Sequence, residues 1–427
     1  MVEGPQHGRC EDGRVQQRSS VFTQRGFRPF WLGQGLSQVG FQFSALAMPV
    51  VAVLLLHATE AQLGYLNASE TAAFLLVGLL AGGWVDRWRK RRVMLVADLV
   101  RAGASLPIPI AFLTGHLAMW QLYVVAGVLG IATVFFDVAY QGYVPILVDD
   151  EHVADANGVL EGTSQVARLG GPALAGLLLK LVSAPVLILV HAVTFLASAA
   201  SLALIRDAEV RRPLEDRRPL RTEIAEGIRF VASHPVLRAV TATTALTNVG
   251  STILFTLEPL LVLRRLGIDP SIFGVALSVG AVGGLAGSVV APRLARRIGE
   301  GPTLRWMILL SVAGSALLPL LVVFPRAWTV AVLCLTSVVF SFSVVVYNVI
   351  QVTARQRLCP RELLGRMNAS IRFVVWGVMP LAALLAGWLG TTIGLIGALW
   401  VGVGVAALSC LPLWVGAVGR LRTFHDS

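Results

Sequence analysis

The sequence predicts an all-α membrane protein with twelve transmembrane helices arranged as two six-helix repeats. Hydrophobic residues make up 56% of the 427 residues, charged residues only 14%, and the mean hydropathy is +0.74. A soluble domain carries about 25% charged residues. The apolar residues fall in blocks of roughly 20, the length that one helix needs to cross the hydrocarbon core. Backbone groups in lipid must bond within the protein, so each block is expected to be a helix.

Six candidate spans precede residue 206, and six follow residue 236. Those of the first half are Phe30–Leu56, Tyr65–Val85, Val93–Leu113, Leu117–Ala139, Val159–Val182 and Val186–Ile205. Those of the second half are Leu237–Leu263, Ile272–Ala291, Leu304–Phe324, Trp328–Tyr347, Ile371–Leu389 and Leu395–Val415. The fifth span has a polar start and the eighth is rich in glycine, so these two are the least regular.

The basic residues predict how the spans are oriented. With the N-terminus in the cytoplasm, 28 of the 35 Lys and Arg residues lie in inner segments, 4 in outer loops and 3 within spans. Cytoplasmic loops of membrane proteins are enriched in Lys and Arg, and one missed span would invert every later loop. We therefore expect a multi-pass protein of the cell membrane with both termini cytoplasmic. The net charge of +11 then reflects topology and contact with anionic lipid, not nucleic-acid binding.

The chain divides into two membrane halves and three cytoplasmic segments. The expected parts are an N-terminal tail (1–29), the first half (30–205), a linker (206–236), the second half (237–415) and a C-terminal tail (416–427). Within the linker, Leu220, Ile224, Ile228 and Val231 recur at helical spacing among charged residues. This pattern predicts an amphipathic helix on the inner membrane face.

Short matches relate the two halves. Tyr140–Gln141, Asn157 and Gly171–Pro172 correspond to Tyr347–Asn348, Asn368 and Pro380, at offsets of 207 to 211 residues. Parallel six-helix repeats are a known transporter architecture, and chance similarity is the alternative.

The loop after the second span carries a gate-like motif. It reads Gly82-Gly-Trp-Val-Asp86-Arg87-Trp-Arg89-Lys90-Arg91. An acid near a helix end, followed by bases able to bond neighbouring carbonyls, suits a gate. The loop resembles motif A of the major facilitator superfamily at Gly82, Asp86, Arg87, Lys90 and Arg91, with Arg89 where that motif has a glycine. The alternative is a basic loop that only fixes topology.

The fifth span resembles motif C of the same superfamily, which is associated with exporters. The matching positions are Gly158, Ala167, Gly171, Pro172, Ala175 and Gly176. Ordinary close packing of small residues is the alternative. The segments Phe27–Trp31, Ala97–Arg101, Phe135–Asp137 and Gly365–Asn368 are similar to the branch that includes enterobactin exporters and macrolide efflux pumps. That resemblance implies the superfamily fold and proton-coupled efflux.

Charges within spans are costly and mark functional candidates. Asp98, Asp137, Glu161 and Arg372 lie near the inner ends of their spans, and Arg101 lies about one turn deeper. We expect these five residues to form a cytoplasmic charge network. The alternative for each is an interfacial charge that reaches water.

Polar residues on the first and seventh spans predict the substrate cavity. Gln34, Gln38 and Gln42 share one face of the first span, and Asn248 and Glu258 lie along the seventh. Stripes facing each other across the repeats would line a cavity; interhelical hydrogen bonding is the alternative. For Glu258 a second alternative is an ion pair with Arg264 or Arg265. Arg168, near mid-bilayer, is a candidate for holding an anionic substrate or a buried carboxylate.

The absent motifs bear on the energy source. Arg89 precedes Lys90 and Leu179 precedes Lys180, so the chain has no Gly-Lys-Ser/Thr phosphate loop, and no His lies in an HExxH motif. We therefore expect no ATP use, no catalytic or metal site, no cofactor and no enzyme activity. The expected function is secondary active, proton-coupled efflux of a small amphipathic molecule, such as a drug, siderophore or other secondary metabolite, by a monomer. Alternatives are proton-coupled import and, from another class, a membrane receptor or sensor.

Overall fold

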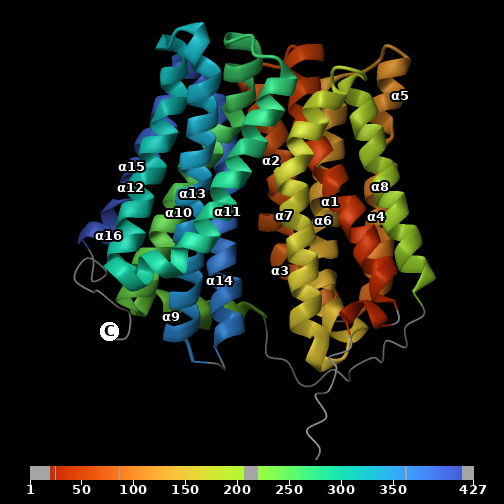
Figure 1. Cartoon of the computed structure of the whole chain (residues 1–427), viewed down its shortest axis with the longest axis vertical. Coiled ribbons are helices and arrows are strands. Elements are labelled where there is room, and N and C mark those ends of the chain that lie inside the picture. The colour runs from red at the N-terminus through yellow and green to blue at the C-terminus, as the bar shows by residue number, and fades with distance from the viewer. Residues whose placement is uncertain (1–19, 25, 86, 206–219, 361–362, 416–427) are drawn as a thin grey trace, which may run out of the picture.

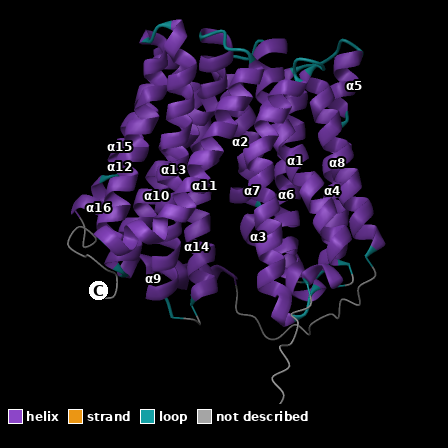
Figure 2. Cartoon of the chain, in the orientation of Figure 1, coloured by secondary structure: helices purple, strands orange, loops and turns teal. Residues whose placement is uncertain are grey.

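The computed structural model describes residues 20–24, 26–85, 87–205, 220–360 and 363–415. Figure 1 shows long helices in two side-by-side groups, one from each half of the chain. Figure 2 shows that the described residues form helices joined by short loops. The all-α prediction is confirmed.

The first half contains six spans, of which two are broken. They are α1 (Phe27–Val50) with the π-helical turn η2 (Val51–Leu55), α2 (Glu60–Leu76) with α3 (Gly78–Val85), α4 (Lys90–Ser105) with α5 (Pro107–Leu113), α6 (Met119–Leu147), α7 (Val153–Leu178) and α8 (Ala184–Leu204). Short 3-10 turns lie at Val21–Thr23 and Asp150–His152.

The second half begins after α9 (Leu220–Ser233), which occupies the segment where the sequence predicts an amphipathic helix. Its spans use α10 (Pro235–Pro259) with the π-helical turn η4 (Leu260–Arg265), α11 (Pro270–Ile298), α12 (Glu300–Leu320) with the 3-10 turn Leu321–Val323, α13 (Arg326–Leu358), α14 (Leu364–Gly377), α15 (Met379–Leu408) and α16 (Leu411–Val415). The backbone turns at Gly394 inside α15, where φ is +77°. This turn separates the eleventh span from the twelfth.

Length and hydropathy alone identify nine membrane-crossing stretches among the described residues. The second span is missed because Val77 divides it into α2 and α3. The fifth, α7, carries Asp155, Glu161 and Arg168. The last stretch, Met367–Val415, contains two spans. The chain therefore has the predicted twelve spans.

Several helices extend well beyond the predicted spans. α7 begins at Val153 instead of Val159, and α13 continues to Leu358 instead of Tyr347. These extra turns carry charged residues such as Asp155 and Arg355. Hydropathy marks only the part of a helix that lies in lipid, so the polar turns were not predicted.

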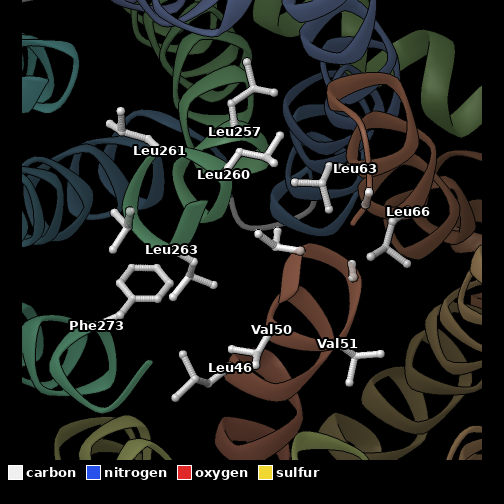
Figure 3. Close-up of a cluster of buried hydrophobic side chains, with 14 of the residues drawn as sticks. Leu46, Val50, Val51, Leu63, Leu66, Leu257, Leu260, Leu261, Leu263 and Phe273 are labelled. Carbon is white, nitrogen blue, oxygen red and sulfur yellow. The ribbon is translucent and has the colours of Figure 1, made fainter. Parts of the chain in front are cut away.

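The two halves share an apolar core at one end of the bundle only. Figure 3 shows this shared core, in which Leu46 and Val50 of α1 lie near Leu260 and Leu263 of η4 and Phe273 of α11. Each of the other buried clusters draws its residues from a single half. We call the end with the shared core the closed end, and the other, where α9 lies, the α9 end. The halves are thus joined at the closed end and less so at the α9 end.

Two glycines permit the close approach of the halves. A Cβ on Gly64 of α2 would lie 2.7 Å from the carbonyl oxygen of Ala383, and one on Gly274 of α11 would lie 2.3 Å from that of Pro172. Only a residue without a side chain fits at such distances. Ser278 Oγ also accepts a 2.8 Å hydrogen bond from the Ala173 amide across the α7–α11 contact.

Candidate functional site

A cavity of about 510 Å³ lies between the two halves. Its lining comes from α1, α2, α6 and α8 of the first half and from α10 and α11 of the second. Most of this lining is apolar, and it includes five phenylalanines: Phe41, Phe74, Phe195, Phe255 and Phe273. A concave, mostly apolar site with a few polar groups is typical of small-molecule binding.

Three carboxyl groups line this cavity at different depths. Glu70 of α2 lies ten residues from the start of its helix, and Asp137 of α6 lies ten residues from the end of its own, about 15 Å in each case. Glu258 of α10 lies seven residues before the end of η4, about 10 Å from the closed end. The lining therefore offers acidic groups from both halves.

Glu70 was not predicted from the sequence as a site residue. Its side chain is exposed, and it lines the cavity although it lies in the middle of a span. The sequence contains a signal for Glu70, because an acidic residue inside a membrane span is a functional candidate. The predicted span begins at Tyr65, only five residues before Glu70. The actual helix begins at Glu60, with Thr59 as its cap.

A buried ion pair lies behind the cavity wall in the first half. Arg101 bonds Asp98, one turn away on α4, and both side chains are buried. The Arg101 guanidinium also lies 4.1 Å from the ring centre of Phe136 and 4.4 Å from that of Phe195. His191, which lines the cavity, packs on Phe195 with 4.1 Å between ring centres. Phe195 thus lies between Arg101 and the cavity, while the charge of Arg101 still acts on Asp137 and His191 of the lining.

A smaller cavity of about 140 Å³ adjoins the first on the α9 side. Phe74 and Asp137 line both cavities, and Arg372 and Trp376 of α14 line the smaller one. The Arg372 guanidinium lies 4.6 Å from the Trp376 ring centre. Phe74 meets Trp376 edge to face, 4.8 Å between centres. These two rings form a contact between the halves at the boundary of the cavities.

Four of the five residues predicted to form a charge network interact, because Arg101 pairs with Asp98 and the charges of Arg101 and Arg372 both act on Asp137. Asp98 and Arg101 pair with each other, while Asp137 and Arg372 share the smaller cavity. Glu161 lies on an exposed part of α7 and accepts a 2.6 Å hydrogen bond from Gln165. A functional network among all five stays a prediction.

The motif A-like loop connects neighbouring helices of the first half. Arg91 donates hydrogen bonds to the carbonyls of Leu202 (2.7 Å) and Ala203 (3.0 Å) at the end of α8. The Lys90 side chain packs on Gly142 of α6. Gly82 lies in α3, Arg87 is exposed beyond it, and Asp86 lies outside the described residues. One base of the loop, Arg91, thus bonds carbonyls of a neighbouring helix, while gating stays a prediction.

The motif C-like positions mostly form a packing face on α7. Ala167, Gly171, Pro172, Ala175 and Gly176 are all buried. A Cβ on Gly171 would lie 2.5 Å from Gln42 Cβ of α1, and one on Gly176 would lie 2.9 Å from Ser271 of α11. Gly158 is different, since a Cβ there would meet open space.

Of the six residues predicted to form the substrate cavity, Glu258 is in the lining. The other five are Gln34, Gln38, Gln42, Arg168 and Asn248, and they are not among the described lining residues. Gln42 packs on Gly171, and Asn248 donates a 2.9 Å hydrogen bond to the Val375 carbonyl. Arg168 is exposed on α7.

The Glu258–Arg264 ion pair, an alternative from the sequence, does not form. Arg264 donates instead to the carbonyls of Val53 (3.2 Å) and Ala58 (2.7 Å), which belong to the first half.

No group of three or more potential metal ligands occurs within the described part of the chain.

Known structures share this arrangement of helices. An inward-facing bacterial homologue of the iron transporter ferroportin matches with a TM-score of 0.72 at 17% identity, over 92% of this chain and 98% of that one. An outward-facing structure of such a homologue matches with a TM-score of 0.53 at 18% identity, over 91% and 98%. The nucleoside transporter NupG gives 0.72 at 10% identity, over 91% and 98%.

Sequence relatives cover nearly the whole chain. YfiS of Bacillus subtilis, an uncharacterized MFS-type transporter, is 25% identical over 93% of both chains. The multidrug efflux pump Tap of Mycobacterium bovis is 27% identical over 85% of both. Macrolide efflux protein A of Streptococcus pyogenes is 24% identical over 86% of this chain and 90% of that one. The family model of the Major Facilitator Superfamily matches residues 30–380. The chain therefore belongs to the major facilitator superfamily and is a multi-pass membrane transporter.

Proposed function

We propose that the protein is a proton-coupled exporter of small amphipathic molecules that works by alternating access. The observation that carries the proposal is the central cavity between the halves, with its apolar and aromatic wall and its three carboxyl groups. Such a wall suits the apolar part of a ligand, and the polar groups orient it.

The carboxyl groups support proton coupling. Neither Glu70, Asp137 nor Glu258 has an ion-pair or hydrogen-bond partner among the described residues. An unpaired carboxylate in a membrane cavity is costly, and protonation removes that cost. Asp137 is the first candidate for the proton carrier, because it lines both cavities. A proton can then reach it from the α9 side while ligand occupies the larger cavity.

The direction of transport is proposed from the relatives. Tap and macrolide efflux protein A are named for efflux. The resemblance of α7 to motif C, which is associated with exporters, supports the same direction.

Transport in inverted membrane vesicles tests both coupling and direction. We expect an acid vesicle interior to drive uptake of a fluorescent lipophilic dye, because inversion turns export into uptake. Asp137→Asn should lose most of this uptake, whereas Asp155→Asn, at an exposed position on α7, should retain it. Dye loss from preloaded vesicles under the same gradient would instead indicate import. Full uptake by Asp137→Asn would remove that residue from the coupling step.

Cysteine labelling tests the proposed orientation, in which the α9 end faces the cytoplasm. In a background without native cysteines, His116→Cys should react with an impermeant maleimide added to intact cells. Ser233→Cys, at the end of α9, should react only after the membrane is opened. Both positions are exposed. The opposite pattern would contradict the layout.

A further inference from the structure

We propose that the central cavity takes lipophilic cations, with Glu258 and Glu70 recognising the positive charge. The inference rests on the proposed function of the cavity as the substrate site, and it adds the charge class of the substrate. It differs from the expectation from sequence that Arg168 could hold an anion, because Arg168 is not among the described residues of the lining.

The charge of the lining is acidic. The described lining residues include three carboxyl groups and contain no Lys or Arg. Arg101, behind Phe136 and Phe195, is paired with Asp98. Arg372 lies in the smaller cavity beyond Trp376. Opposite charges attract more strongly where water is scarce, so this cavity favours a cation and disfavours an anion.

Glu258 is the most enclosed of the three acids. Glu258 is 8% exposed, and Arg264, one of the two arginines that were alternative partners for it, instead bonds the carbonyls of Val53 and Ala58. A buried charge without a partner costs several kcal/mol unless it is neutralised or paired. A bound cation would provide that partner.

Two further polar side chains on the wall are buried and unsatisfied. The Thr256 hydroxyl and both ring nitrogens of His191 have no hydrogen-bond partner, although these residues are 3% and 2% exposed. Most buried polar groups in folded proteins are hydrogen-bonded, so exceptions call for an explanation. These atoms have almost no accessible surface, so a ligand reaches them only if the two side chains turn toward the cavity.

The aromatic residues of the lining fit the same ligand class. Phe255 and Phe273 of the second half lie on the same wall as Glu258, and Phe41, Phe74 and Phe195 line the side formed by the first half. Aromatic rings attract cations through their negative faces and also bury the apolar groups around the charge. A cation with an aromatic or aliphatic shell would use both properties.

The test compares two ions of nearly equal shape and opposite charge. Tetraphenylphosphonium and tetraphenylborate are each measured by equilibrium dialysis against the purified full chain, with protein-free micelles as the blank. We expect the phosphonium ion to bind and the borate ion to bind at least about tenfold more weakly, the scale of one charged interaction. Equal affinities, or tighter borate binding, would overturn the proposal.

Variants then locate the recognising groups. Glu258→Gln and Glu70→Gln keep side-chain size and should each weaken phosphonium binding by about tenfold. Asp155→Asn is the control. Unchanged binding by both glutamine variants would overturn the assignment. If Glu258→Gln does not fold, the proposal is still tested by Glu70→Gln and by the comparison of the two ions on the unaltered chain. Binding is measured without a gradient, so a failure here is distinct from a failure of the export assay.

Discussion

Replacing Arg264 with glutamine is expected to shift the protein toward a state in which the closed end opens. The Arg264 guanidinium joins the second half to two carbonyls of the first, those of Val53 and Ala58. Each hydrogen bond to a charged group is worth about 1.5–3 kcal/mol. Arg264 is exposed, so competition from water removes part of this energy. We expect at least about 1.4 kcal/mol to remain, so losing both bonds should change the ratio of the two states by about tenfold or more.

The internal repeat shows what is special about Arg264. Pro49 precedes the π-helical turn η2, and Pro259 precedes η4. In the first half, the amides of Leu56 and Ala58 donate to the carbonyls of Val51 and Ala52. In the second half, the amides of Leu266 and Ile268 donate in the same way to the carbonyls of Leu261 and Val262. All these pairs are 210 residues apart. At that offset the equivalent of Arg264 is Leu54. The two halves therefore have the same backbone turn, but one guanidinium links them.

Cysteine accessibility measures the shift in both directions. Ala45→Cys reports on the central cavity and Ala369→Cys on the smaller cavity. Arg264→Gln should raise labelling of position 45 from the closed end and lower labelling of position 369 from the α9 end. A general loosening of the fold would instead raise the labelling of both cysteines. Arg265→Gln is the matched control, because Arg265 is exposed and has no bond among the described residues. Equal labelling in the two glutamine variants would contradict this role for Arg264.

The spans were predictable because backbone N–H and C=O groups in lipid must bond within the protein, and an apolar segment achieves this as a helix. Every apolar block of the sequence became a helix, including the two that hydropathy scoring misses. The helix ends were not predictable from the same signal. α2 begins at Glu60 through the Thr59–Gln62 capping box, five residues before the predicted start. With the helix starting at Glu60, Glu70 lies ten residues from that start, well inside the span.

The cavity lining was harder to predict than the spans, because a helical stripe does not identify its neighbour. Gln34, Gln38 and Gln42 do share a face of α1, yet Gln42 packs on Gly171 of α7. The cavity is lined by Phe41, Ala45 and Met48 instead. Adjacent residues on a helix point about 100° apart, so a small rotation of α1 decides which stripe faces the cavity. Tertiary packing sets that rotation.

For the charges within the spans, contacts along one helix were predictable from the sequence, and contacts between helices were not. Asp98 and Arg101 are three residues apart on α4, a spacing at which two side chains of one helix can pair, and they do pair. Spacing could not predict that Phe136 of α6 and Phe195 of α8 would pack on Arg101. These contacts come from different helices, and they explain how a guanidinium is accommodated deep in the first half.

Breaking the Asp98–Arg101 pair is expected to cause the largest loss of stability among single substitutions at charged sites. Both side chains are buried, and removal of one partner leaves the other charge unpaired. Such a loss costs about 3–5 kcal/mol. Arg101→Ala also removes the contacts with Phe136 and Phe195. Arg101→Ala and Asp98→Ala should therefore both reduce the yield of folded protein and its midpoint of thermal unfolding in detergent.

A second ion pair in the same chain provides the control. Arg357 of α13 bonds Glu300 of α12 at 2.8 Å, but its side chain is 50% exposed. An exposed pair contributes about 0–1 kcal/mol, so Arg357→Ala should unfold close to the temperature of the unaltered protein. The double variant Asp98→Ala/Arg101→Ala should lose less than the sum of its single variants, because neither charge is then left alone. Additive losses, or single variants as stable as Arg357→Ala, would show that the buried pair does not support the fold.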